Sequence, residues 1–311
     1  MQEKSLIIIQ GPTGVGKSSI AEALAEHYNG EIISADSRQV YRHLNIGTAK
    51  PDETILKEVK YHLINIVSPV DEYNAGDFCR DALAAMEDIR QRGKTPIIVG
   101  GTGFYISALL NGLAAIPPIS DAARKQVAEL FEKGTPETIY GFLKQVDPDA
   151  AAGIERNDLH RQQRALEVFT ETGTPISAFW KTDQESFEYN YVNILLMRDR
   201  AKLYERINKR VDNMLAAGLI DEIRNLLANG FAESDPGMNT VGYREFYPWL
   251  KGEISLESAI DKMKQHSRNY AKRQITWYKK QEFHLTLDIN SLSLSNVKEK
   301  IDQYVKKVLE I

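Results

Sequence analysis

The sequence predicts an α/β protein in which helices flank a parallel sheet and an all-helical domain is inserted. Short apolar runs at 6–9, 31–35, 95–99 and 193–197 predict buried strands, with stretches of helical periodicity between them. A glycine-rich loop directly follows the first run. Between about 120 and 181, helix starts recur without a convincing strand, which predicts the insertion.

Composition is that of an ordinary globular protein, with 42% hydrophobic and 26% charged residues in a chain of 311. We expect an α/β core formed by 1–116 and 191–311, and the helical domain at 117–190. The net charge of −4 argues against a uniformly basic surface but allows a local basic groove. Cys79 is the only cysteine, and no apolar run is long enough for a membrane span, so we expect a cytoplasmic protein without an internal disulfide.

The glycine-rich loop reads G-P-T-G-V-G-K-S and fits the pattern G-x-x-x-x-G-K-[ST], so the expected sheet is P-loop NTPase-like. Backbone N–H groups and a helix N-terminus in such a loop attract phosphate oxygens. Lys17 should contact the outer phosphate, and the Ser18 hydroxyl should ligate Mg²⁺. The alternative is a glycine-rich turn with a surface lysine. The predicted diphosphate-binding residues are Gly11, Pro12, Thr13, Gly14, Val15, Gly16, Lys17 and Ser18.

Asp36 follows the second predicted strand, at the sheet edge where ligands of such folds gather. Its carboxylate could be a metal-shell ligand or a general base, or it could only cap the turn. After the strand at 95–99 the chain has Gly100-Gly101-Thr102-Gly103, where an ATPase would place an acidic metal ligand. The missing acid argues against ATP hydrolysis.

Positive charge is clustered in three further segments. In a helix expected from 157, His160, Arg161 and Arg164 share a face, which is either solvated or contacts a phosphate backbone. In a helix expected from 201, Arg206 and Arg210 lie one turn apart. They could clamp a diphosphate, or pair at the surface with Glu205, Asp212 or Asp199.

The third segment, 262–280, contains seven Lys or Arg residues and no Asp or Glu. Its cations are Lys262, Lys264, Arg268, Lys272, Arg273, Lys279 and Lys280, and its aromatic residues are Tyr270, Trp277 and Tyr278. Cations interleaved with aromatic rings favour binding of unpaired bases in a nucleic acid. A solvated basic helix is the alternative.

Seven ordered segments together resemble the bacterial tRNA dimethylallyltransferases, also called tRNA isopentenyltransferases, of the IPP transferase family. The resemblance runs from about Leu6 to Lys280. It rests on the segments 11–18, 34–51 (S-A-D-S-R-Q-V-Y-R-H-L-N-I-G-T-A-K-P), 100–106 (G-G-T-G-F-Y-I), 164–168 (R-A-L-E-V), 206–211 (R-I-N-K-R-V), 241–245 (V-G-Y-R-E) and 271–277 (A-K-R-Q-I-T-W). Asn65 departs from the family, where Asp is commoner.

The resemblance implies transfer of a dimethylallyl group from dimethylallyl diphosphate to the N6 amine of the adenosine just 3′ of a tRNA anticodon, with Mg²⁺. It implies Asp36 as the base, Arg210 as a diphosphate ligand, and Thr102 as a contact of the flipped adenosine. The tRNA anticodon stem-loop would be the macromolecular partner, no membrane would be involved, and a monomer is expected. The implied tRNA-lining residues are Asp36, Ser37, Arg38, Gln39, Thr102, Arg124, His160, Arg161, Gln162, Gln163, Arg164, Asn239, Thr240, Val241, Gly242, Tyr243, Arg244, Lys272, Arg273, Gln274, Ile275, Thr276, Trp277, Tyr278 and Lys279.

Three rival functions remain open on the residues alone. A small-molecule or nucleoside kinase would explain the phosphate loop and Asp36, but not the basic aromatic segment. A prenyltransferase acting on a free adenine nucleotide would not need that segment either. A non-catalytic RNA-binding protein would not need Asp36.

Overall fold

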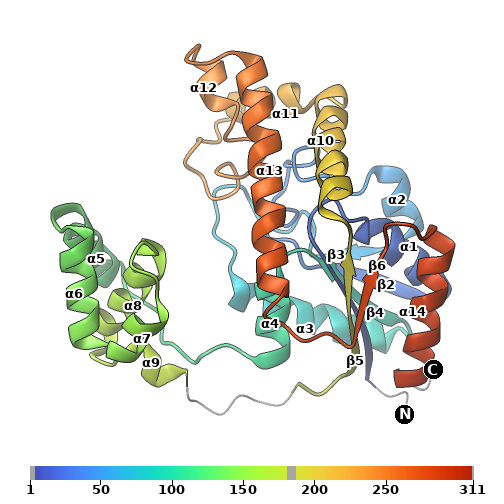
Figure 1. Ribbon diagram of the computed structural model, residues 1–311, viewed down its shortest axis with the longest axis horizontal. Helices are drawn as coiled ribbons and strands as arrows, with labels where there is room; N and C mark the ends of the chain where they lie inside the picture. Colours follow the sequence, from blue (N-terminus) through green and yellow to red (C-terminus); the bar gives the residue numbers. More distant parts are fainter. Residues whose placement is uncertain (1–3, 181–186, 310–311) are drawn as a thin grey trace. The chain divides into compact units, whose positions relative to one another are not determined.

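The computed structural model describes residues 4–180 and 187–309 (Figure 1). The chain forms two compact units, one made of Met1–Leu110 with Glu188–Ile311 and the other of Asn111–Phe187. The first unit contains the sheet and the phosphate loop, and the second contains helices.

Six strands form one sheet in the order β3-β2-β4-β1-β5-β6, and every neighbouring pair is parallel. The predicted parallel sheet is therefore confirmed. At its centre, β1 (Ser5–Gln10) lies between β4 (Thr95–Gly100) and β5 (Asn190–Met197). β2 (Gly30–Ser34) pairs with β4 and carries the short β3 (Tyr61–His62), while β6 (Leu285–Asp288) pairs with β5. Because all strands run the same way, the loops after β1, β2 and β4 meet at one edge.

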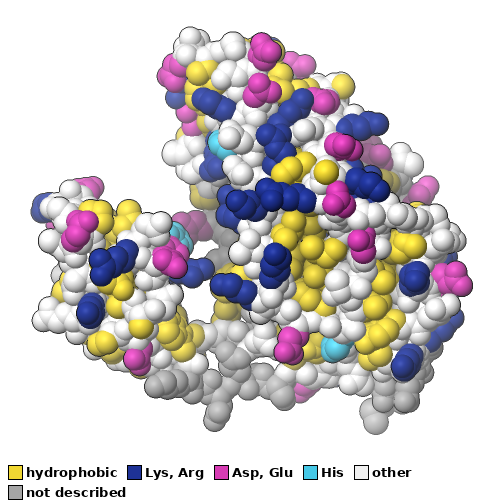
Figure 2. Space-filling model, in the orientation of Figure 1, with side chains coloured by type: hydrophobic (Ala, Val, Ile, Leu, Met, Phe, Trp, Pro, Cys, Tyr) yellow, Lys and Arg dark blue, Asp and Glu magenta, His cyan; other side chains and the backbone are white. Residues whose placement is uncertain are grey.

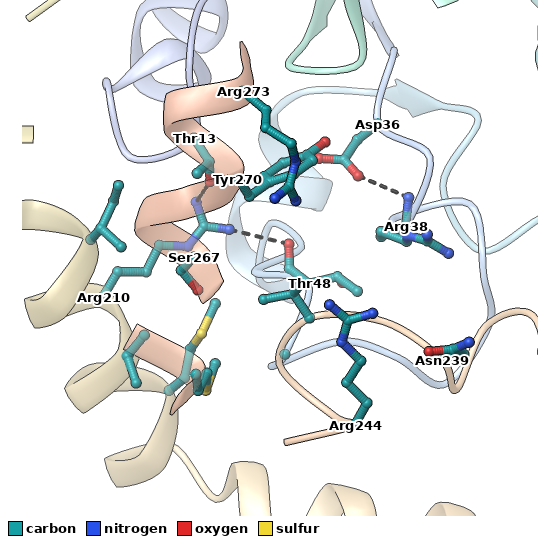
Figure 3. Close-up of a pocket in the computed structure, with 16 residues that line it drawn as sticks. Thr13, Asp36, Arg38, Thr48, Arg210, Asn239, Arg244, Ser267, Tyr270 and Arg273 are labelled. Atoms are coloured by element: carbon teal, nitrogen blue, oxygen red, sulfur yellow. Dashed lines mark hydrogen bonds between the residues drawn. The ribbon is translucent and has the colours of Figure 1, made fainter. Parts of the chain in front are cut away.

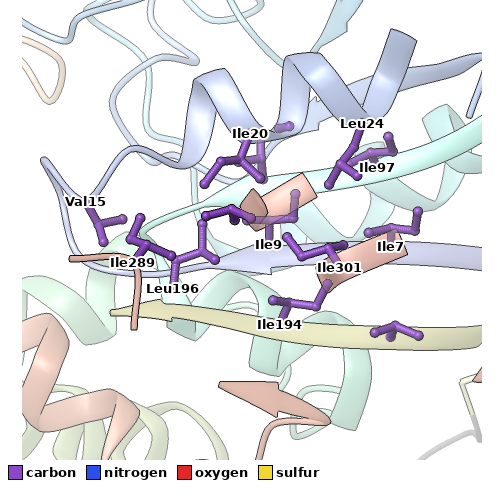
Figure 4. Close-up of a cluster of buried hydrophobic side chains, with 14 of the residues drawn as sticks. Ile7, Ile9, Val15, Ile20, Leu24, Ile97, Ile194, Leu196, Ile289 and Ile301 are labelled. Carbon is purple, nitrogen blue, oxygen red and sulfur yellow. The ribbon is translucent and has the colours of Figure 1, made fainter. Parts of the chain in front are cut away.

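Helices cover the sheet and bury its side chains. α1 (Lys17–His27) and α14 (Leu294–Leu309) pack together over the sheet (Figure 4). Alternate strand residues such as Ile7, Ile9 and Ile97 point toward them and are fully buried. α3 (Ala75–Gln91) packs on β2 and β4. This core fixes the strand ends from which the phosphate loop and Asp36 emerge.

A second core in the same unit supports the loops beyond the sheet edge. It is formed mainly by α10 (Arg200–Ala216), α11 (Leu219–Ala228) and α13 (Leu256–Tyr278), which pack around the fully buried rings of Tyr243 and Phe246. The unit also contains α2 (Glu53–Glu58), α4 (Gly103–Asn111) and α12 (Tyr247–Leu250). In the ranges 4–180 and 187–309, no helix has the length and apolar character needed to cross a bilayer.

The second unit consists of α5 (Asp121–Lys133), α6 (Pro136–Val146), α7 (Pro148–Gly153), α8 (Leu159–Thr172) and α9 (Ile176–Phe179). The recurring helix starts expected after about 120 are confirmed, because the side chains of Ser120, Thr135, Asp147 and Asp158 each accept a backbone N–H of the following turn. Leu143 and Leu166 centre its apolar core. Leu159 shares the helical face of Leu166 in the sequence pattern, yet it is exposed because it starts α8 beyond the packed turns.

Candidate active site

The phosphate loop runs from the end of β1 to the start of α1, and its backbone requires glycine. Gly11 has φ +154°, and a Cβ there would lie 2.5 Å from the carbonyl oxygen of Leu196. Gly16 has φ +112° and stands immediately before the first residue of α1. The loop therefore brings its backbone and the N-terminus of α1 to the edge of the sheet.

Lys17 turns its ammonium group into the loop. Nζ donates to the carbonyl oxygens of Gly11 at 2.8 Å and Pro12 at 3.0 Å. Burial lowers the pKa of Lys17 to about 7, against the raising effect of Asp36, and the charge of Arg210 lowers it further. Two cations and one carboxylate thus share a desolvated space, which favours binding of an anion.

Asp36 lies two residues beyond β2, at the start of a turn. Its Oδ1 accepts the backbone N–H of Arg38 at 2.9 Å and of Gln39 at 3.4 Å, so it caps the turn. Among the described residues, both hydrogen bonds of Asp36 go to Oδ1, and the residue also lines a cavity. Thr102 supports the same turn, since its Oγ1 accepts the N–H of Ser37 at 3.0 Å.

Arg210 points from α10 toward the phosphate loop. Its Nη1 donates to Oγ1 of Thr13 and its Nη2 to the carbonyl oxygen of Thr48, each at 3.4 Å (Figure 3). Burial lowers its pKa, and the carboxylate of Asp36 opposes this. Arg206, one turn earlier, donates through Nε to the carbonyl oxygen of Gly14 at 2.9 Å.

Two of the three acids considered as surface partners of these arginines are engaged elsewhere. Asp212 pairs with Lys264 at 2.6 Å, and Asp199 caps α10. The two arginines instead contact the phosphate loop, so α10 places two guanidinium groups beside it.

Two adjoining cavities meet at the phosphate loop. One, of about 70 Å³, is lined by the loop, including Lys17 and Ser18. The other, of about 210 Å³, has an apolar wall of Ile207, Val211, Met214, Val241 and Met263. Both are lined by Thr13, Asp36, Arg210 and Tyr270, so the carboxylate borders both cavities; Figure 3 shows these four residues in the larger one.

The last turns of α13 have two different faces. On the inner face, Gln274 donates through Nε2 to the carbonyl oxygen of Gly101 at 2.8 Å, and its Oε1 accepts the N–H of Thr13, also at 2.8 Å. The hydroxyl of Tyr278 lies 3.2 Å from the carbonyl oxygen of Gly11. On the outer face, Lys272, Thr276 and Lys279 are exposed, and Arg273 is exposed at the rim of the larger cavity. One helix therefore links the phosphate loop to a basic surface.

The IPP transferase family model matches residues 39–281 of this chain. The chain belongs to the IPP transferase family. Among curated relatives, it is 40% identical over 300 residues to a tRNA dimethylallyltransferase of Thermotoga petrophila, covering 96% of this chain and 97% of that protein. It is 44% identical over 286 residues to tRNA dimethylallyltransferase 1 of Citrifermentans bemidjiense, covering 90% and 92%.

Solved structures give the same assignment. The tRNA isopentenylpyrophosphate transferase of Staphylococcus epidermidis is 39% identical with a TM-score of 0.71, covering 97% of this chain and 99% of that one. A eukaryotic dimethylallyltransferase acting on tRNA is 33% identical with a TM-score of 0.81, covering 96% of this chain and 78% of that one. The family and the fold expected from the sequence are thus confirmed.

Several residues expected to line tRNA in this IPP transferase family member face the cavity or its rim. Asn239, Val241, Arg244 and Arg273 line the larger cavity together with Arg38. Lys and Arg side chains gather over the middle of α13 (Figure 2). The exposed cations of segment 262–280 are Lys262, Lys272, Arg273, Lys279 and Lys280. Lys264 and Arg268 differ, because they bind Asp212 and Asn208 of α10.

Other residues of that expected set face the interior. Gln274 and Tyr278 are buried against the phosphate loop. Thr240, Gly242 and Tyr243 are buried beneath the cavity wall. The side chain of Gln39 bonds to Ser34 and to the carbonyl oxygens of Thr48 and Ala49. Ile275 and Trp277 are half-buried, and Trp277 meets the exposed Phe104 edge-on at 6.3 Å between centroids.

In the helical unit, Arg124, His160 and Arg161 are exposed. Gln162 is fully buried, and its amide donates to the carbonyl oxygens of Glu155 and Arg156. Its side chain is therefore not accessible to RNA. Gln163 and Arg164 are half-buried and contact Glu167 on the same helix, at 2.9 Å and 3.7 Å.

A bound Mg²⁺ would fit the donor set at the loop. Ser18 is exposed and lines the smaller cavity, which Asp36 also lines. One hydroxyl with a nearby carboxylate suits an ion that takes its remaining ligands from phosphate oxygens and water. Within the described residues no cluster of three or more acidic, His or Cys side chains offers a complete metal cage.

Sequence reasoning missed two features of the site. The apolar wall from α10 and α13 has no sequence signal that distinguishes it from core packing, although Met214 and Met263 line the larger cavity. Glu222 was not singled out, because an acid on an amphipathic helix carries no local signal of its partners. Glu222 contacts Tyr243 and Ile46, which are 21 and 176 residues away along the chain.

Proposed function

We propose that this enzyme transfers the dimethylallyl group of dimethylallyl diphosphate to the N6 amine of the adenosine at position 37 of tRNA, next to the anticodon. The observation that carries the proposal is the position of Asp36 between the cavity at the phosphate loop and a larger, partly apolar cavity. A carboxylate at this position would lie close to a diphosphate bound at the phosphate loop and to a nucleophile that enters through the larger cavity.

The diphosphate would bind at the phosphate loop, held by Lys17, Arg210 and the loop amides. Breaking the bond between the allylic carbon and oxygen leaves both bonding electrons on the diphosphate. The ammonium and guanidinium groups stabilise this growing negative charge because both are desolvated there. Arg206, bonded to Gly14, supports the loop from outside.

The five-carbon group would lie against the apolar wall of the larger cavity. A cavity of about 150 Å³ holds benzene in a model protein, so about 210 Å³ accommodates a five-carbon tail. Ile207, Val211 and Met263 supply that wall. Burial of the tail also keeps water from the allylic carbon, which would otherwise be hydrolysed.

The N6 amine would attack the allylic carbon from the side of Asp36. As the nitrogen–carbon bond forms, Oδ2 of Asp36 accepts one amine proton, so the product nitrogen is neutral. Thr102 and the turn amides hold the carboxylate in place. The adenine must leave its stack to enter the cavity, where the ring of Tyr270 and the guanidinium of Arg273 line the wall.

Mg²⁺, ligated by Ser18, would neutralise charge on the diphosphate oxygens when bound. The exposed cations of α13 and the arginines at the cavity rim would contact the tRNA backbone. We further infer a cytoplasmic monomer, because one anticodon stem-loop and one diphosphate substrate suffice for the cavities of one chain.

Radiolabelled dimethylallyl diphosphate offered with tRNA, with AMP, or alone separates the candidate functions. We expect label in tRNA, and nuclease digestion followed by mass spectrometry should place one five-carbon unit on the adenosine 3′ of the anticodon. A matched tRNA with guanosine at that position should stay unlabelled. Label in AMP but not tRNA, or phosphate transfer from ATP in a parallel assay, would contradict the proposal.

A further inference from the structure

The loop 44–50 forms part of the wall of both cavities. Gly47 and Thr48 line the larger cavity, and Ala49 lines the smaller one. The carbonyl oxygen of Thr48 accepts from Nη2 of Arg210 at 3.4 Å and from the amide of Gln39 at 3.3 Å. The position of this loop therefore helps to set where the guanidinium of Arg210 lies.

Glu222 of α11, which lines neither cavity, anchors that loop. Its carboxylate accepts three consecutive backbone N–H groups, those of Asn45 at 3.0 Å, Ile46 at 2.9 Å and Gly47 at 3.1 Å. Carboxylates that accept backbone amides form strong, directional bonds. Three such bonds to one side chain fix the loop's path.

The same carboxylate holds a second part of the cavity wall through Tyr243. The Tyr243 hydroxyl donates to Oε1 of Glu222 at 2.6 Å. The ring packs closely against Gly47, where a Cβ would be only 2.4 Å from a ring carbon. Tyr243 belongs to the segment 239–244, whose residues Asn239, Val241 and Arg244 line the larger cavity. Glu222 thus joins two loops that face the same space.

We propose that Glu222 is a positioning residue for the transfer reaction: it locks the loops 44–50 and 239–244 together and so holds Arg210, through the carbonyl of Thr48, in reach of the diphosphate. Glu222 itself does not line the reaction cavity. The inference rests on the proposed function, because it takes Arg210 as a ligand of the diphosphate substrate.

Glu222→Gln tests the proposal with little change of shape. The amide keeps one acceptor oxygen but turns an NH₂ group toward a backbone N–H donor, so at least one of the three bonds of the anchor is lost. We expect kcat/KM for dimethylallyl diphosphate to fall by about 10- to 100-fold, because small misplacements of a ligating group cost rates of this order. Affinity for tRNA should stay within about three-fold. Asp221→Asn is the matched control, since this neighbour on α11 is exposed and its loss of charge should leave the kinetics unchanged.

A double-mutant cycle separates positioning from general weakening of the fold. If Glu222 acts through Arg210, Glu222→Gln should add little to the loss already caused by Arg210→Lys. Multiplicative losses would overturn the inference. Wild-type kinetics of a folded Glu222→Gln protein would do so as well, and wild-type kinetics of Arg210→Lys would instead contradict the proposed function.

Should Glu222→Gln not fold, Tyr243→Phe keeps the ring on Gly47 and removes one donor. We expect it to lower kcat/KM for the diphosphate substrate in the same direction by a smaller factor. An unchanged value in that variant would then count against the proposal.

Discussion

Gln274 and Thr13 are 261 residues apart in the chain, yet the side-chain oxygen of Gln274 accepts the Thr13 N–H at 2.8 Å. One amide of the phosphate loop is therefore already bonded to the basic helix α13. The side-chain NH₂ group of Gln274 donates to the carbonyl oxygen of Gly101. The loops after β1 and β4 are thus tied together by a residue that the sequence places among RNA contacts.

Replacing Gln274 by Leu should destabilise the protein and weaken diphosphate binding. The half-buried Thr13 N–H would lose its side-chain partner at a cost of about 1–3 kcal/mol, whereas the Gly101 carbonyl would keep the Tyr278 hydroxyl at 3.3 Å. We expect the melting temperature to fall by a few degrees, and calorimetry should show weaker binding of diphosphate. The salt dependence of tRNA binding should not change. Gln265→Leu, at an exposed position of the same helix, is the control. Equal melting temperatures for the two variants would contradict this role.

The sequence predicts those parts of the site that depend on local pattern. The phosphate loop can be recognised from the glycines that its backbone requires. Asp36 can be recognised because it directly follows a buried strand. The central strands β1, β2, β4 and β5 are apolar enough to recognise, whereas β3 has only two residues and β6 is half-exposed in alternation.

The inward face of a polar helix is not predictable from its own residues. Gln162 stands between arginine and glutamine in H-R-Q-Q-R and looks like a surface residue, yet it is fully buried. Gln274 and Glu222 are similar cases. Their partners are backbone groups of distant loops, so only the tertiary structure reveals which polar side chains are structural.

Asp36→Asn and Asp36→Ala should separate the two roles of this carboxylate. Asn can still accept the N–H groups of the turn, so we expect its melting temperature to match the wild type. It cannot accept the amine proton, and we expect the transfer rate to fall by about 10²–10⁴. Ala should lose the rate and also some stability. Binding of tRNA should stay within a few-fold in both. Near wild-type transfer by Asp36→Asn would leave Asp36 as a turn cap alone.

Lys50 binds Asn65, the residue at which this sequence departs from the Asp that is commoner in the family. The ammonium of Lys50 donates to Oδ1 of Asn65 and to the carbonyl oxygen of Tyr41. Burial lowers the pKa of Lys50 from 10.5 to about 8, against the raising effect of Glu222 and Asp36. The folded state binds fewer protons than the unfolded state between these values, so stability contributed by this group rises with pH across that window.

Asn65→Asp would place a carboxylate beside Lys50 and raise the pKa of that lysine. We expect the variant to be more stable than the wild type near neutral pH, and its gain in stability on going from pH about 7 to about 9.5 to be smaller. Melting temperatures of both proteins at the two pH values test this. Parallel pH profiles would show that Lys50 does not sense the side chain at position 65.

The last prediction concerns the outer face of α13 as the tRNA-binding surface. Lys272, Arg273 and Lys279 are exposed there, while Lys264 and Arg268 are bound to α10. Each phosphate neutralised contributes about 0.7–0.9 to the slope of log K against log salt. Replacing Lys272, Arg273 and Lys279 together by Gln should therefore flatten the slope by about 2–3 and weaken tRNA binding.

Three exposed or half-exposed lysines of α14, Lys298, Lys300 and Lys307, provide a control with the same change of charge. Their replacement by Gln should leave the slope within about 0.5 of the wild type, since long-range charge effects are screened beyond about 10 Å at 0.1 M salt.

Trp277→Ala should act differently from both triple variants. If a base stacks on the indole, this variant should bind tRNA more weakly by about 1–3 kcal/mol without a change in the salt slope. If the indole instead serves to pack against Gly103, the free protein should have a lowered melting temperature. An unchanged slope in the folded α13 variant would exclude this face as the main tRNA contact and direct attention to the exposed Arg124 and Arg161 of the helical unit.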